Sequence, residues 1–255
     1  MLDTENDDIH KIIETYRILA ADRDSITYDY GKNIKDFKGV DIDYLQEKIK
    51  LFNPNHSEKF DFPKPHGGGT AYMNTIDKDG LGVSLIQSNF HGIGSRIGVG
   101  SFGFFLHNRG CGFNLDSKHP NYLTPGRKPL HTLSPTIWSK NGNLEFIAGT
   151  RGGRYQPQLL IQTILPYIRK SDSFEEIIKE PRWVIENFSS ETISKLRFEK
   201  INNEDLEILL KKGHEVEVEN KLNKAYGPIS IIYKKDDGNF EGVCDVRVGT
   251  EKVFN

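Results

Sequence analysis

The sequence predicts an α+β protein that contains antiparallel sheets. Strand-like and helix-like segments occur in clusters rather than in regular alternation. Most connections between neighbouring strand-like segments are short, as in antiparallel pairs. The 255 residues, 36% of them apolar, are enough for one large domain or two small ones with a sizeable core.

Two helices are predicted before residue 53. The first follows from apolar residues that recur on one helical face: Ile9, Ile12, Ile13, Tyr16 and Leu19. The second, weaker one covers 44–52. Residues 53–69 contain three prolines and end in Gly67, Gly68 and Gly69, with no apolar periodicity. This stretch is predicted to be a mobile connector.

Strand signals begin at Thr70. Residues 70–76 and 82–90 flank a turn signal at 77–80, which predicts a β-hairpin. Further strands are expected at 102–107, 136–139 and 144–148.

A glycine-rich turn at 149–153 then precedes a helix. Its apolar residues are spaced for one buried face: Leu159, Leu160, Ile164, Leu165 and Ile168. The remaining chain predicts helices at 174–179 and 203–212 and strands around Val216, at 229–233 and at 242–246.

Charge and composition exclude several classes of protein. The net charge is −2, so nothing electrostatic favours nucleic acid or anionic lipid as a partner. The longest apolar runs are too short for a membrane span. The acidic N-terminus lacks the features of a secretory signal, and only two cysteines occur, which predicts a reducing, cytoplasmic location.

Three weaker signals receive structural interpretations. The glycine pattern at 98–103 matches a dinucleotide fingerprint, but the residues after it continue as a strand, so a flexible loop is favoured over a nucleotide site. The eight histidines show no metal-ligand spacing and are interpreted as scattered surface residues, and no metal or organic cofactor is expected. Cys111 is interpreted as a small buried packing residue.

The junction of Gly69 and Thr70 is the most informative position. A threonine at the start of a chain has a hydroxyl nucleophile and, two bonds away, a free amine with a pKa of ~8 that can act as the base. Thr70 could gain that amine only by cleavage of the Gly69–Thr70 bond. A glycine before it permits the strained backbone that an N-to-O acyl shift requires. From spacing alone, a glycine linker entering a strand remains the simpler alternative.

Five segments, in order and spacing, resemble the C-terminal part of the γ-glutamyltransferase family, and in particular its γ-glutamyltransferase-like branch, which includes acylases. They are residues 69–80, 84–90, 106–113, 125–135 and 149–153. The tail at 242–247 is similar to a variant of the family's closing motif.

The resemblance implies an N-terminal-nucleophile hydrolase with a four-layer αββα sandwich that cleaves itself between Gly69 and Thr70. Residues 1–69 would then be the end of a large-subunit-like region, and 70–255 the small-subunit-like catalytic region. It also implies Thr70 as nucleophile, Ser88 as its supporting hydroxyl, and Gly152 and Gly153 as the oxyanion hole. The implied reaction is acyl transfer from a γ-glutamyl or related acyl amide to water or an amine, without a cofactor.

The sequence departs from the family pattern in the substrate pocket. Gly112 stands where the family has an acidic residue that holds the substrate's amino group. Arg109 replaces a polar residue and would favour an anionic group, although a structural arginine paired with a carboxylate is an equal alternative. His131 and Thr132 replace a pair of serines, and Asn89 is the candidate for an asparagine expected near Phe90. These departures are typical of the γ-glutamyltransferase-like branch.

The family's N-terminal portion is not represented, so a separate N-terminal, large-subunit-like polypeptide is the expected partner, with the first helix and the sheet edges exposed in its absence. The alternative is a non-catalytic subunit or pseudoenzyme left by gene splitting. The joint presence of Thr70, Ser88, Gly152 and Gly153 favours the enzyme.

Overall fold

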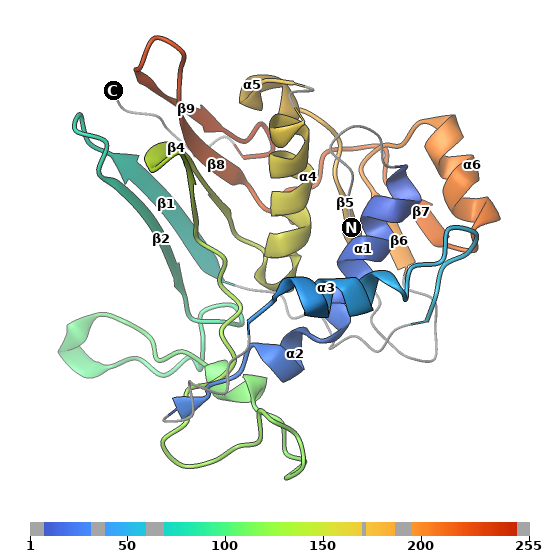
Figure 1. Cartoon of the computed structure of the whole chain (residues 1–255). Helices are drawn as coiled ribbons and strands as arrows, with labels where there is room; N and C mark the ends of the chain where they lie inside the picture. Colours follow the sequence, from blue (N-terminus) through green and yellow to red (C-terminus); the bar gives the residue numbers. More distant parts are fainter. Residues whose placement is uncertain (1–7, 32–38, 60–68, 170–171, 187–194, 249–255) are drawn as a thin grey trace.

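A computed structural model describes residues 8–31, 39–59, 69–169, 172–186 and 195–248 (Figure 1). The helices are α1 Ile9–Ala21, α2 Arg23–Ile26, α3 Ile42–Ile49, α4 Gln156–Ile168, α5 Phe174–Ile177 and α6 Asn203–Lys211. The strands are β1 Thr70–Ile76, β2 Gly82–Ser88, β3 Thr136–Lys140, β4 Asn143–Thr150, β5 Trp183–Ile185, β6 Lys195–Phe198, β7 Glu215–Val218, β8 Ile229–Lys234 and β9 Phe240–Cys244. Across these ranges, none of the helices has the length and apolar character that a bilayer crossing needs.

Two sheets are stacked face to face. Strands β3, β4, β8 and β9 form an antiparallel sheet in the order β3-β4-β8-β9. The antiparallel hairpin β1-β2 packs on one face of this sheet, and α4 packs against β4 on the other (Figure 1). The described residues therefore supply three layers, helix on sheet on sheet.

The main apolar core lies between α4 and the four-stranded sheet. Leu159, Leu160 and Ile164 of α4 meet inward residues of β4 and β8. Ile168, which the periodicity places on the same face, is 50% exposed because it belongs to the last turn, beyond the sheet.

The hairpin approaches the four-stranded sheet closely at Gly149. A Cβ on Gly149 would lie 2.2 Å from the ring of Tyr72, so only glycine admits this ring. The Tyr72 hydroxyl is within 3.0 Å of the Ser84 hydroxyl across the hairpin. The packing of Tyr72 on Gly149 positions β1 on the four-stranded sheet, and therefore positions Thr70 at the start of β1.

A second core joins the N-terminal helix to the C-terminal part of the chain. Ile13 of α1 is fully buried among Trp183, Leu196 and Leu209 from β5, β6 and α6. The expectation of an exposed first helix is therefore wrong, because this helix packs on the chain's own third sheet. That sheet, β5-β6-β7, was not fully predicted, and its β6-β7 pair is parallel.

Two local predictions are also wrong. Residues 102–107 do not form a strand: Gly100–Phe102 is a 3₁₀ turn, and only an isolated bridge joins Gly98 to Phe105. No α-helix follows the glycine pattern at 98–103, in line with its interpretation as a loop. Cys111 is exposed rather than buried. In the predicted connector, residues 60–68 lie outside the described residues.

Not all histidines are on the surface. His10 of α1 and His214 before β7 are 0% and 4% exposed, and the His10 Nδ1 and His214 Nε2 atoms are 2.8 Å apart. The His10 Nε2–H donates to the Asn53 carbonyl at 2.9 Å. Glu14, beside them, forms a buried ion pair with Arg17. This histidine cluster, defined as His10, Glu14, Arg17 and His214, links α1 to the C-terminal part of the chain.

Candidate functional site

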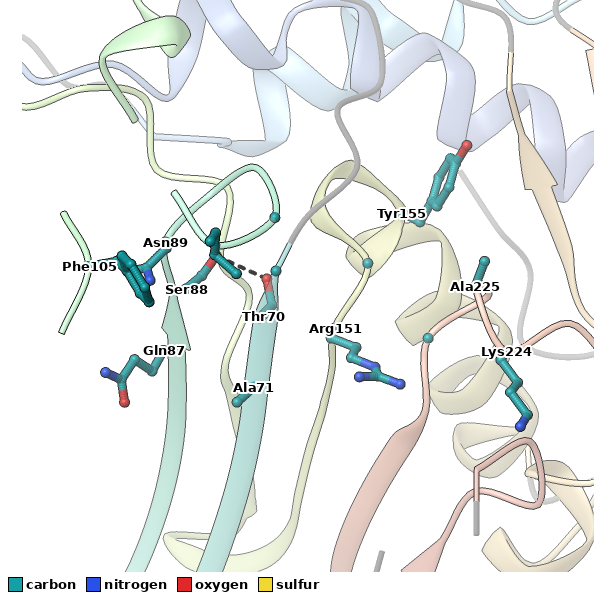
Figure 2. A pocket seen from close by; sticks show the side chains of 15 residues that line it. Thr70, Ala71, Gln87, Ser88, Asn89, Phe105, Arg151, Tyr155, Lys224 and Ala225 are labelled. Atoms are coloured by element: carbon teal, nitrogen blue, oxygen red, sulfur yellow. Dashed lines mark hydrogen bonds between the residues drawn. The ribbon is translucent and has the colours of Figure 1, made fainter. Parts of the chain in front are cut away.

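Thr70 and Ser88 face each other at the open end of the hairpin. The β1-β2 register pairs Thr70 with Ser88, the last residue of β2. The Thr70 hydroxyl donates to the Ser88 Oγ at 3.0 Å, and the Phe90 N–H donates to the same oxygen at 3.0 Å (Figure 2). Ser88 thus holds the Thr70 Oγ in one orientation.

Gly69, immediately before Thr70, is tightly confined. Its N–H donates to the Phe90 carbonyl at 2.9 Å. A Cβ at this position would lie 1.8 Å from the Gly92 carbonyl oxygen, so no other residue fits without displacing that loop. The Gly69–Thr70 peptide bond is therefore held from the side of the loop that follows β2.

The glycine turn between β4 and α4 lies beside Thr70. Gly152 and Gly153 have φ values of 127° and 58°, where L side chains are strained. Gly152 lines the same cavity as Thr70, whereas Gly153 is buried directly behind it. In the described residues, no hydrogen bond takes the N–H of either glycine. An N–H pair at a helix start suits a developing oxyanion.

These residues surround a cavity of about 670 Å³. Figure 2 shows Thr70 between two sides of it, with Ser88, Asn89 and Phe105 on one and Arg151, Tyr155 and Lys224 on the other. The charged residues that line it in the described part of the chain, Arg151 and Lys224, are both cationic. Burial raises the pKa of Tyr155 to about 12, with Glu186 contributing, so its hydroxyl stays protonated at neutral pH.

Three of the predicted substrate-binding residues, Arg109, His131 and Thr132, lie close to one another and are not among the residues that line this cavity. Arg109 is 8% exposed, and its Nη1 donates to the Thr132 Oγ1 at 3.4 Å. Burial lowers the pKa of His131, and Arg109 lowers it further. Of the four predicted residues, only Asn89 lines the cavity. Gly112 packs against Leu130.

Sequence reasoning did not single out Arg151, Tyr155 and Lys224 as site residues. Arg151 is inside a segment that carried the resemblance, so a cation next to the predicted oxyanion glycines was a visible signal. Lys224 is far away in sequence and reaches the cavity because Gly227 packs against the glycine turn. A Cβ on Gly227 would lie 2.2 Å from the Arg151 carbonyl oxygen.

A strand that begins at a paired hydroxyl, in a sandwich of two sheets with a flanking helix, is the arrangement of the N-terminal-nucleophile hydrolase fold. The same fold occurs in the cephalosporin acylase of Bacillus halodurans, with a TM-score of 0.77 and 27% identity over 93% of this chain and 43% of that one. The family model for γ-glutamyltranspeptidase matches residues 2–254, and the chain belongs to this family.

Two curated relatives are similar over nearly the whole chain. The glutathione hydrolase-like YwrD proenzyme of Bacillus subtilis is 31% identical over 93% of this chain and 45% of its own length. The oxamate amidohydrolase proenzyme of Klebsiella pneumoniae is 31% identical over 94% of this chain and 46% of its own length. The chain thus spans about half the length of the curated relatives it matches.

Proposed function

We propose that this chain is the nucleophile-bearing part of a self-cleaving amidohydrolase or acyltransferase that acts on γ-glutamyl or related acyl amides. The main support is the pair of hydroxyls of Thr70 and Ser88, whose oxygens are 3.0 Å apart. Thr70 directly follows Gly69, and both hydroxyl residues line one cavity with Gly152. Two of the similar proteins are named as proenzymes and one as an acylase, which supports an active enzyme rather than a non-catalytic subunit.

Self-cleavage proceeds through an ester. The Thr70 Oγ adds to the Gly69 carbonyl carbon, the Gly69–Thr70 C–N bond breaks, and the proton from Oγ ends on the freed Thr70 amine. Water then hydrolyses the Gly69 ester and leaves a carboxylate on Gly69. The close packing of Gly69 against Gly92 supports this step because it holds the scissile carbonyl in place.

The new N-terminus then acts on substrate. The Thr70 amine takes the proton of Oγ as Oγ attacks the acyl carbonyl, and returns it to the leaving amine. Gly152 and Gly153 are proposed to stabilise the oxyanion through their N–H groups, and Ser88 to orient Oγ. Water or an acceptor amine then cleaves the acyl-threonine ester. We assign Arg109, Asn89, His131 and Thr132 to substrate binding.

A large-subunit-like polypeptide is proposed to complete the enzyme and its fourth layer. The outer face of the hairpin carries Met73, Val83 and Leu85, which are 52%, 47% and 45% exposed. Met73 and Leu85 are directly paired across the hairpin, so these side chains form one apolar patch. An apolar sheet face of this kind is a typical interaction surface. Replacing Leu85 with Glu should prevent assembly, measured by co-purification with the product of a neighbouring gene.

Intact mass tests the proposed function. The chain is purified alone and co-produced with that neighbouring gene product, beside a Thr70→Ala variant. We expect two fragments, residues 1–69 and 70–255, in at least one preparation of the wild type and none in the variant. A single uncleaved chain in every preparation would refute the proposal. Processed protein is then assayed on γ-glutamyl amides and on oxamate, an amide that carries a carboxylate.

A further inference from the structure

Arg109 is a buried cation without a counterion among the described residues. Within them, its buried Nη2 atom has no hydrogen-bond partner, and its side chain makes one hydrogen bond, the 3.4 Å contact of Nη1 to Thr132. In the described part of the chain, no carboxylate pairs with it. Its guanidinium carbon lies 5.3 Å from the centre of the Phe90 ring, which is itself 5% exposed. The structural alternative, an arginine paired with a local carboxylate, is therefore not what the structure contains.

A buried guanidinium whose Nη2 has no partner is energetically unfavourable unless an anion completes it. Burial lowers the pKa of Arg109, and no acid among the described residues opposes this effect. The described charges that act on His131 are likewise cations, Arg109 and Arg23, and they lower its pKa further. A guanidinium fork matches the two oxygens of a carboxylate.

The position of Arg109 connects it to the reacting atoms. It stacks on Phe90, whose N–H donates to the Ser88 Oγ that holds Thr70. The Phe90 carbonyl also accepts the N–H of Gly69, so the ring on which Arg109 lies belongs to a residue that contacts the Gly69–Thr70 junction. The preceding residue, Asn108, donates its backbone N–H to the carbonyl of Asn89, a cavity residue, at 3.1 Å.

The cavity offers no group that would recognise an ammonium ion by charge. Among the described residues, its lining side chains include two cations, Arg151 and Lys224, and no carboxylate. Gly112, near Arg109 in sequence, has no side chain to supply one. A substrate with both a carboxylate and an ammonium group would place the ammonium in a cationic environment.

We propose that Arg109 anchors a carboxylate on the acyl group, and that the site selects acyl groups that carry a carboxylate but no ammonium, such as monoamides of dicarboxylic acids. This inference rests on the proposed acyl-transfer function. It makes Arg109 the residue that determines specificity, with Thr132 orienting its guanidinium.

Three amides test the selection. Butanamide, glutaramate and glutamine contain the same four-carbon acyl amide. Glutaramate carries a carboxylate on the carbon farthest from the amide, glutamine carries a carboxylate and an ammonium group on that carbon, and butanamide carries neither. Ammonia release by the processed enzyme should give glutaramate a kcat/KM at least tenfold above both others. Arg109→Gln should lower the glutaramate-to-butanamide ratio at least about thirtyfold, as expected for loss of one partner of a buried charge pair. Arg109→Lys should restore part of it.

The matched control is Arg96→Gln, the same change at an exposed arginine that forms no ion pair with the described residues, and it should leave the ratio unchanged. A preference for glutamine, or an unchanged ratio in Arg109→Gln, would overturn the inference. The inference would also be overturned if Arg151→Gln or Lys224→Gln, rather than Arg109→Gln, lowered the glutaramate-to-butanamide ratio. Calorimetric titration with glutarate tests the site without turnover: no binding, or equal binding by wild type and Arg109→Gln, counts against it. Intact mass reports self-cleavage separately, so failure of the proposed function is distinguishable.

Discussion

Acidification should weaken the attachment of α1 to the rest of the chain through the buried histidine cluster. Burial lowers the pKa of His214 to about 3, and His10 and Arg17 lower it further. The unfolded chain therefore takes up this proton more readily than the folded chain. The stabilisation is complete above the unfolded pKa of ~6.5 and is lost as the pH falls toward about 3.

The magnitude follows from the pKa shift. Each pH unit between these two values removes about 1.4 kcal/mol from the free energy of unfolding, so a change from about pH 7.5 to about pH 5 removes roughly 2 kcal/mol. His214→Gln keeps a polar amide near the Nε2 position and cannot titrate. It should show a pH dependence smaller by this amount.

Urea unfolding at the two pH values measures the effect. The Thr70→Ala background keeps the chain in one piece, and His56→Gln serves as the control at a histidine whose side chain is 58% exposed. Equal pH dependence in wild type and His214→Gln would refute the reasoning. In processed protein, the same protonation should promote release of the fragment that contains α1.

Three further predictions concern single side chains. Gly69→Ala should abolish self-cleavage, seen by intact mass, because its Cβ would collide with the Gly92 carbonyl oxygen; normal cleavage would contradict the proposed placement of the scissile bond. Ser88→Ala should slow the appearance of fragments about tenfold or more by freeing the Thr70 hydroxyl, and Ser88→Thr should not. Asp245→Asn should lower the free energy of unfolding by about 3–5 kcal/mol in urea, because it leaves buried Arg182 without its carboxylate.

Local patterns predicted the elements whose own sequence carries the information. In the β1-β2 hairpin, a turn signal lies between the two strands, and exposed and partly buried residues alternate along each strand, as expected for a half-buried hairpin. α4 has a continuous apolar stripe after a glycine turn, and the structure has a helix there. The resemblance named Thr70 and Ser88 as parts of one site, and the register of the two strands places them opposite each other.

What depends on distant contacts could not be predicted in this way. β5 has three residues and β6 four, too short for a clear period, and they are stabilised by α1 from the other end of the chain. The histidine cluster joins residues 204 positions apart, so no spacing rule detects it. The missing counterion of Arg109 is likewise a property of packing rather than of sequence pattern.

The glycine turn beside Thr70 is supported from behind by a buried ionic network. Arg182 pairs with Asp245 and donates to the Gly227 carbonyl at 2.6 Å, and Gly227 in turn packs on the Arg151 carbonyl. The backbone of the turn is therefore set by residues that substrate does not reach. The side chain of Arg151 is exposed and lines the cavity. Evolution or engineering can thus exchange the charge at position 151, and retune which substrates enter, without disturbing the framework that places the N–H groups.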